Sequence, residues 1–304
     1  MTHKTAFPVL LMPFLLFSCD FSRSSQPDPT PSGATPVSVI AASGREILEW
    51  HPDSGWRVEG QPSLVPEQAT VRAVFHAVLV DPAGQERPFP GDARIQDARF
   101  MPGQAPVLAY LDAGDRLMLW NPSTGVNTEL ATSVFPGFSF SPNPKTIAYT
   151  SGIFPEMELF ILELDSQRSL RLVDEDGPVM LPAFSPDGRE IVYVSSLGGH
   201  PSLAVIPAAG GTPRRITNKE IPADGSWVHA SRLAPAPDGR QPPLWTTEGL
   251  LFENANGLFR LDPATGRFTG FWSQTRLPVI KAGTPHRFDG HLLSPLGSPD
   301  RVQP

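Results

Sequence analysis

The stretch PAFSPDGREIVY, residues 182–193, decides the fold that this sequence predicts. Its centre, Ser-Pro-Asp-Gly, favours a turn, because proline fixes φ, aspartate can bond to its own backbone and glycine accepts a positive φ. Residues 191–193 are β-branched or aromatic, and such residues suit a buried strand. We therefore expect Phe184 and residues 191–193 to be buried, while Asp187 and Gly188 form an exposed turn.

The same phrase recurs along the chain. Three further copies lie at residues 98–110, 138–149 and 233–240. The prolines at the four turns are Pro102, Pro142, Pro186 and Pro237. Their spacings of 40, 44 and 51 residues lie at or slightly above the period of about 40–45 residues that is typical of propeller blades.

A second phrase, a strand followed by a Pro/Asp/Gly turn and another strand, falls between the copies of the first. It occurs six times, at residues 47–55, 77–84, 117–125, 159–165, 203–211 and 258–266. Turns of this type join antiparallel strands. Together the two phrases predict an all-β fold, a β-propeller of about six four-stranded blades, because a ring of such blades leaves few exposed edges.

One part of the repeat resembles a known family. Residues 177–217, in which the quoted stretch is followed by Gly-Gly-Thr-Pro-Arg-Arg-Ile-Thr, resemble the WD40-like (PD40) repeat of TolB-type propellers. The resemblance extends, with more differences, over residues 135–174. It implies that residues 37–275 form a TolB-like β-propeller, and that residues 276–304 are a Pro/Gly-rich C-terminal tail or a closing strand.

The N-terminal residues predict a secretory signal. Lys4 precedes an apolar run from Ala6 to Phe17, which is too short to span about 30 Å of hydrocarbon as a helix. The end of this segment, Leu-Phe-Ser-Cys, resembles a bacterial lipobox. That resemblance implies a lipid on Cys19 and cleavage just before it. An ordinary signal peptide with a free cysteine, or a buried core cysteine, is the alternative.

We accordingly expect residues 1–18 to be a lipoprotein signal peptide. Residues 19–36 are rich in Ser and Pro and have little to bury, which predicts a disordered, lipid-anchored tether. Acyl chains on Cys19 would hold the protein on a membrane of the bacterial cell envelope. The expected location is the periplasmic side of the inner membrane, or the outer membrane, and Asp20 beside the cysteine favours the former.

Composition and missing motifs exclude several classes of function. The net charge is −7, and no Lys/Arg cluster exists beyond Arg214 and Arg215, so we expect no nucleic-acid partner. The single cysteine rules out an internal disulfide in the mature domain. The sequence has no Gly-x-Ser-x-Gly elbow, Walker loop or His-Glu-x-x-His motif. We therefore predict no catalytic residues and no cofactor, and we expect a monomer.

Two segments contain candidate metal ligands. Residues 174–177, Asp-Glu-Asp-Gly, resemble the start of a calcium loop, but Ser185 stands where such a loop needs its glutamate. His286, Asp289 and His291 offer two imidazoles and a carboxylate. A solvated turn and scattered surface histidines are the simpler interpretations, so the sequence predicts no metal site.

The aromatic residues provide the remaining candidates for binding. The six tryptophans are expected to pack in blade cores, and they are Trp50, Trp56, Trp120, Trp227, Trp245 and Trp272. Trp227 and His229 are our candidates for a binding contact on the face that carries the loops. The sequence thus favours a non-catalytic envelope scaffold for a protein, peptide or glycan. The alternative is an envelope enzyme, a metal-assisted hydrolase or lyase with its site at the channel mouth.

Overall fold

A computed structural model gives the fold of residues 41–51, 53–63, 74–153, 156–173, 175–195, 202–216, 243–254, 257–273, 279–281, 284–288, 293–295 and 297–299. Residues 36–304 form one compact unit. All regular secondary structure in the described residues is β-strand. They include no helix with the length and apolar character that crossing a membrane requires. The expected signal peptide and tether lie outside the described residues.

The first eight strands belong to one antiparallel sheet. Their bounds are β1 (Glu46–His51), β2 (Trp56–Pro62), β3 (Phe75–Val80), β4 (Glu86–Pro88), β5 (Arg94–Phe100), β6 (Leu108–Asp112), β7 (Leu117–Asn121) and β8 (Val126–Ala131). Strands β1–β4 and β5–β8 form two four-stranded segments. A short pairing of β3 with β5, Phe75 opposite Ile95 and His76 opposite Arg94, joins the two segments.

The later strands form separate antiparallel sheets. Three are four-stranded, and their strands are β9 (Val134–Phe140), β10 (Thr146–Ile153), β11 (Glu156–Glu163), β12 (Arg168–Val173), β13 (Val179–Phe184), β14 (Glu190–Ser195), β15 (Ser202–Pro207), β16 (Arg214–Arg215), β17 (Leu244–Thr246), β18 (Gly249–Asn254), β19 (Gly257–Leu261) and β20 (Phe268–Ser273). The range 276–304, for which the sequence predicts a tail or a closing strand, contains a three-stranded sheet. Its strands are β21 (Val279–Lys281), β22 (Thr284–Phe288) and β23 (Leu293–Pro295).

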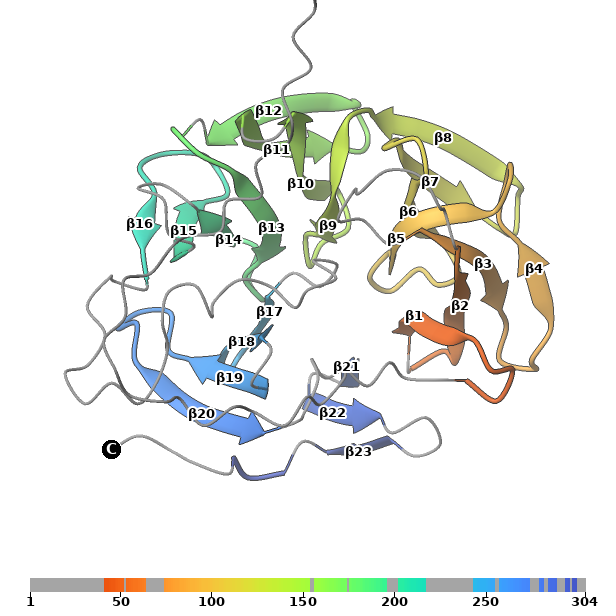
Figure 1. Ribbon diagram of the computed structural model, residues 1–304. Coiled ribbons are helices and arrows are strands. Elements are labelled where there is room, and N and C mark those ends of the chain that lie inside the picture. Colours follow the sequence, from red (N-terminus) through yellow and green to blue (C-terminus); the bar gives the residue numbers. More distant parts are fainter. Residues whose placement is uncertain are drawn as a thin grey trace, which may run out of the picture. The chain divides into compact units, whose positions relative to one another are not determined.

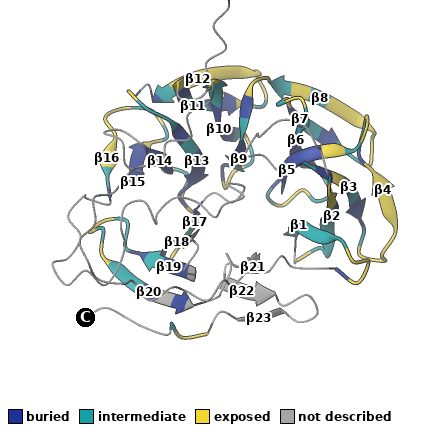
Figure 2. Cartoon of the chain, viewed as in Figure 1, coloured by how far each residue is buried: buried dark blue, intermediate teal, exposed yellow. Residues whose placement is uncertain are grey.

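The first strand of each four-stranded unit contacts the first strand of the next unit. These contacts run from β1 to β5, from β5 to β9, from β9 to β13 and from β13 to β17. Figure 1 shows these first strands turned toward a common centre. The last strands β4, β8 and β12 are mostly exposed, as the yellow ribbons of Figure 2 show. This arrangement of meandering sheets is that of a β-propeller.

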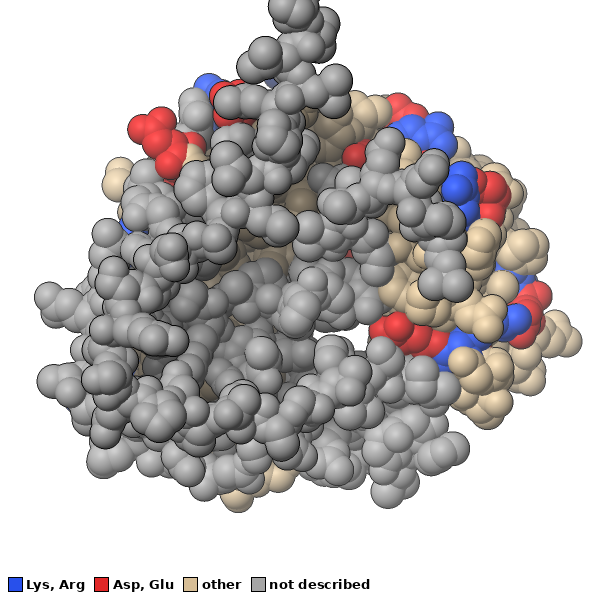
Figure 3. Space-filling view, in the orientation of Figure 1, with Lys and Arg blue, Asp and Glu red and all other residues tan. Residues whose placement is uncertain are grey.

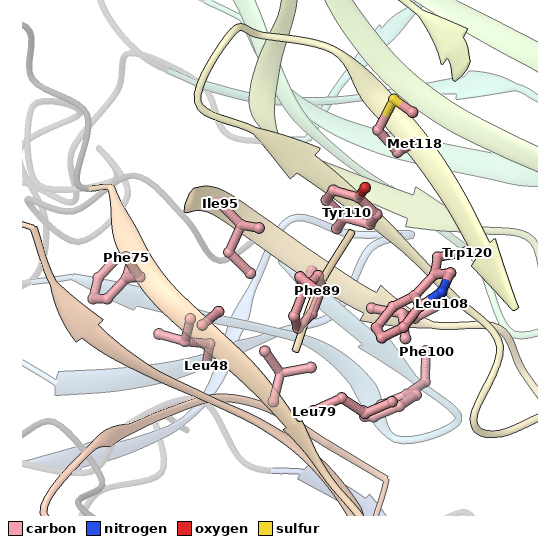
Figure 4. Packing of buried hydrophobic residues seen from close by; sticks show 13 residues of the cluster. Leu48, Phe75, Leu79, Phe89, Ile95, Phe100, Leu108, Tyr110, Met118 and Trp120 are labelled. Atoms are coloured by element: carbon pink, nitrogen blue, oxygen red, sulfur yellow. The ribbon is translucent and has the colours of Figure 1, made fainter. Parts of the chain in front are cut away.

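The hydrophobic core lies between successive sheets. One cluster joins residues of β1–β3 to residues of β5–β7, with Phe89 at its centre. The Phe89 ring lies 5.2 Å from Tyr110 and 5.0 Å from Trp120, between ring centroids (Figure 4). Three further clusters are likewise shared by neighbouring sheets. Because apolar residues are buried between neighbouring four-stranded units, the units stabilise one another.

The Pro-Asp-Gly turn at residues 186–188 has the predicted structure. Phe184 is buried, residues 191–193 are fully buried and Asp187 is exposed. Gly188 has a φ of 72°. The hydroxyl of Ser185 donates to Asp187 Oδ1 at 2.6 Å and accepts the backbone N–H of Glu190 at 2.9 Å. The serine of the repeat therefore closes the turn from both sides.

The hairpin phrases in the sequence outnumber the four-stranded units that contain them. The phrases at residues 47–55 and 77–84 lie in one four-stranded segment, β1–β4, so the six phrases mark five four-stranded units. The turn at residues 51–55 connects β1 to β2, the place that the Pro-Asp-Gly turn occupies in β13–β14. The repeat copy at 233–240 lies outside the described residues, and β17 turns into β18 at residues 247–248.

Candidate functional site

The inner strands carry a repeated irregularity. The pairing of β1 with β2 shifts register between Ile47 and Glu49, and that of β5 with β6 shifts between Ile95 and Asp97. Comparable shifts occur in β9, within residues 135–139, and in β13, within residues 180–183. A β-bulge bends a strand and redirects its side chains, and bulges are enriched beside functional sites. The bulged inner strands are therefore our candidate site.

A buried carboxylate joins two of these strands. Asp97 in β5 is 4% exposed. Its Oδ1 accepts the backbone N–H of Ala98 at 2.8 Å and Nη1 of Arg99 at 2.5 Å. Its Oδ2 accepts the backbone N–H of Gly137, in β9, at 2.9 Å. A buried charge is tolerated only when it is paired and hydrogen-bonded, and Asp97 meets both conditions.

Arg99 extends this cluster to a third strand. Its Nη1 lies 3.7 Å from Glu49 Oε2 in β1 and donates to the carbonyl of Ala98 at 2.6 Å. Its guanidinium carbon lies 6.0 Å from the centroid of the Phe138 ring in β9, within the range of a cation–π contact. One guanidinium group thus contacts the first strands of three successive four-stranded units.

Glu49 is the titratable member of the cluster. Burial raises the pKa of its carboxyl to about 7, the nearby Arg99 guanidinium opposes the rise and Asp97 adds to it. A hydrogen bond from the backbone of Phe100 also lowers this pKa. The side chain keeps 24% of its surface exposed, so solvent reaches it. A carboxyl that titrates near neutral pH is the kind of group that proton transfer requires.

The raised pKa of Glu49 predicts a pH dependence of stability. The folded-state value of about 7 lies above the ordinary 4.5, so the folded protein binds more protons than the unfolded chain between these values. The contribution of Glu49 to stability is therefore full below about pH 4.5 and is lost as the pH rises through 7. The loss is at most about 3 kcal/mol, since one pKa unit corresponds to about 1.4 kcal/mol.

Denaturant midpoints at pH 5 and pH 8 check this prediction. Glu49→Gln cannot titrate, so its midpoint should fall less than that of the natural chain between these two pH values. Glu46→Gln, on the same strand, is the matched control and should follow the natural chain. Equal pH dependence in Glu49→Gln and the natural chain would contradict the prediction.

The residues proposed from sequence are not all placed by the structure. Cys19, Trp227 and His229 lie outside the described residues. Among the described tryptophans, Trp120 and Trp272 are buried, as expected for core residues, whereas Trp50, Trp56 and Trp245 are only partly buried. The binding candidates Trp227 and His229 therefore stay predictions.

The two candidate metal segments are described only in part. In residues 174–177, the Glu175 carboxylate accepts the Tyr193 hydroxyl at 2.7 Å and the Ser195 hydroxyl. It therefore holds this loop to β14. Asp174, Asp289 and His291 lie outside the described residues. Within the described part of the chain, no three His, Cys, Asp or Glu side chains converge as metal ligands would.

Sequence reasoning missed Glu49, Asp97 and Arg99. A weak signal was present, because Asp97 and Arg99 stand two residues apart, a spacing that places two side chains on one side of a strand. Their convergence with Glu49, which is 48 positions before Asp97, depends on the packing of β1 against β5. That contact cannot be read from local spacing.

Comparison with known proteins agrees with this architecture. No protein-family model matches the chain. The chain is 31% identical over 77 residues to tricorn protease homolog 1 of Streptomyces coelicolor, which covers 25% of this chain and 7% of that protein. It is 30% identical over 88 residues to a TolB homolog of Chlorobium chlorochromatii, which covers 29% of this chain and 20% of that protein. The matched segments thus span a small fraction of these relatives.

A solved structure decides the fold. TolB from Agrobacterium tumefaciens superposes with a TM-score of 0.52 at 19% identity, covering 72% of this chain and 77% of that one. The chain has the β-propeller fold of this TolB structure. The β-propeller fold that residues 177–217 predict is thereby confirmed. Glu49 lies on the inner strand of the first four-stranded unit, Asp97 and Arg99 lie on that of the second, and Asp97 is hydrogen-bonded to Gly137 on that of the third.

Proposed function

We propose that this TolB-like propeller is a non-catalytic scaffold that binds a protein, peptide or glycan at the bacterial cell envelope. The observation that supports a scaffold is the bonding of Asp97, whose two oxygens hold Arg99 and backbone N–H groups of β5 and β9. The charged groups of Asp97 and Arg99 thus hold the inner strands together. A rigid framework that presents loops is suited to recognition.

Site-specific photocrosslinking in cells tests this proposal. A photoreactive residue is placed at Asp187, at Glu156 or at Leu170, all of which are exposed. Asp187 and Glu156 lie in turns at opposite ends of their strands, and Leu170 lies on the outer strand β12. We expect one discrete crosslinked product from a single end and none from Leu170. The absence of a product from both ends would overturn the scaffold proposal.

We also propose that Cys19 is lipidated and anchors the propeller to a membrane of the envelope. The sequence pattern at residues 16–19 supports this proposal. Metabolic labelling with a clickable fatty acid should modify the natural chain and leave Cys19→Ala unlabelled. Ser18→Ala is the control and should keep its label. Label that persists in Cys19→Ala would refute the proposal.

One observation favours an enzyme as the second candidate function. Glu49 has a pKa of about 7 and remains accessible, which suits a general acid or base. If the protein is a hydrolase or lyase, turnover of chromogenic esters, glycosides or peptides should disappear in Glu49→Gln. Turnover that is absent from the natural chain, or unchanged in Glu49→Gln, would exclude this role for Glu49.

A further inference from the structure

A pocket of about 520 Å³ lies on the second four-stranded segment, apart from the inner-strand cluster. Its wall comes from the turn that leads into β5, from the turn between β6 and β7, and from the neighbouring strands. The lining residues are Pro90, Gly91, Asp92, Arg94, Tyr110, Asp112, Ala113, Gly114, Arg116, Met118 and Asn127. Figure 3 shows acidic and basic side chains in adjacent patches along the face formed by the first eight strands. The size falls in the range of about 300–1,000 Å³ that is typical of ligand sites.

Two arginines in the pocket are held by neighbouring aspartates. Arg94 Nε donates to Asp92 Oδ2 at 2.6 Å, and the backbone N–H of Arg94 donates to Asp92 Oδ1 at 3.1 Å. Arg116 Nε donates to Asp112 Oδ2 at 2.7 Å, and its Nη2 lies 2.6 Å from the same oxygen. Each guanidinium group is thus oriented by its own turn before any ligand arrives.

The two turns are also fixed to each other. The backbone N–H of Ala113 donates to the carbonyl of Arg94 at 3.0 Å. Gln96, which is 3% exposed, donates from Nε2 to the carbonyl of Asp112 at 2.8 Å and to Asp115 Oδ1 at 2.6 Å. A binding site that is rigid in the free protein loses less entropy when its ligand is bound.

The rest of the lining is uncharged, and Tyr110 and Asn127 are its polar side chains. Asn127 Nδ2 donates to the Tyr110 hydroxyl at 2.9 Å. Tyr110 pairs with Met118 across β6 and β7, and both belong to the core cluster that Figure 4 shows. The pocket therefore rests on packed side chains and offers a hydroxyl and an amide beside the two ion pairs.

The charge balance of the pocket favours a neutral ligand over an anion. Two arginines and two aspartates cancel, and the Glu129 carboxylate lies 3.8 Å from Arg116 Nη1. This balance disfavours an anion. Within the described part of the chain, the Nη groups of Arg94 have no protein acceptor, and the Asp92 side chain is 59% exposed. Donors and acceptors thus stand side by side, which matches hydroxyl groups that both donate and accept.

We propose that this pocket binds a short neutral oligosaccharide, whose hydroxyl groups bond to Arg94 and Asp92. The proposal rests on the binding function inferred above and gives it a ligand class. The ligand is recognised by paired donors and acceptors on a preformed wall, with Arg116 and Asn127 completing the set.

Titration calorimetry and saturation-transfer NMR test the site with maltotriose, cellotriose, mannotriose and chitotriose as probes. We expect at least one probe to bind the natural chain, and Arg94→Ala to weaken that binding at least tenfold. Arg171→Ala is the matched control, because Arg171 is 52% exposed and pairs with Glu158 at 2.6 Å, as Arg94 is 44% exposed and pairs with Asp92 at 2.6 Å. The affinity of Arg171→Ala for the same probe should equal that of the natural chain. Thermal melting of both variants verifies that they fold.

The outcomes separate this proposal from the scaffold itself. If no probe binds, or if Arg94→Ala and Arg171→Ala bind equally, the pocket is not the oligosaccharide site. Binding of an acidic peptide with no neutral sugar bound would also overturn the assignment. In each case, crosslinking from Asp187 or Glu156 would still report on the scaffold independently, since neither residue lines the pocket.

Discussion

Phe184→Ala is expected to lower the free energy of unfolding by about 3–5 kcal/mol, through lost burial and the cavity that remains. Phe184 is 8% exposed. Its ring belongs to the cluster shared by the sheets β9–β12 and β13–β16, together with Ile191 and Tyr193. The substitution therefore weakens the contact between two sheets as well as the strand that carries it.

Denaturant midpoints of purified variants without the first 36 residues measure this effect. Asp187→Ala is the control, because Asp187 is exposed and only closes the turn through Ser185 and Arg189. Its cost should be much smaller. Gly188→Val should cost more than Asp187→Ala, since a β-branched residue is strained at a φ of 72°. If Phe184→Ala were as mild as Asp187→Ala, the packing of this repeat between the sheets would be disproved.

Gly137→Ala is the second substitution with a large expected cost, roughly 3–5 kcal/mol from overpacking and backbone strain together. Gly137 has a φ of 96°. A Cβ at this position would come within 2.1 Å of Leu181 Cδ2 in β13. Leu181 is fully buried, so its side chain has little room to move away. The close approach of two inner strands thus requires glycine here.

Two comparisons separate the steric part of this cost from the backbone part. Gly125 has a φ of 75° but no atom within 4 Å of its would-be Cβ, so Gly125→Ala should cost only about 1–2 kcal/mol from strain. In a Leu181→Ala background, Gly137→Ala should cost less than in the natural chain. Additive costs in this double-mutant cycle would show that the two residues do not collide.

The fold was largely predictable because its turns are determined by a few neighbouring residues. The Pro-Asp-Gly turn at residues 186–188 and the apolar strand after it depend on backbone preferences that act over a few residues. The number of blades was harder to predict from the number of hairpin phrases. Residues 51–55 have the composition of a third-to-fourth-strand hairpin, but they join a first strand to a second. Composition specifies that a turn forms, while its place in the sheet depends on pairing with later strands.

The candidate site could not be predicted from the sequence for a different reason. Glu49, Asp97 and Gly137 lie on three inner strands, and register shifts in those strands help to bring them together. A bulge shifts the alternation of side chains by one residue, so a simple inward–outward pattern gives the wrong direction beyond it. The pocket at Arg94 and Arg116 likewise depends on the contact of two separate turns, which no spacing along the chain reveals.

The short pairing of β3 with β5 has a consequence for how the propeller opens. Phe75 and His76 pair the first four-stranded segment with the second. Among the residues that the structure describes, no backbone hydrogen-bond ladder joins β9–β12, β13–β16 or β17–β20 to a neighbouring sheet. Amide hydrogens of β1–β8 should therefore exchange with deuterium as one cooperative unit, while those of β9–β12, β13–β16 and β17–β20 exchange as separate units. The N-terminal half of the propeller would act as its largest foldon, on which the other sheets assemble in turn.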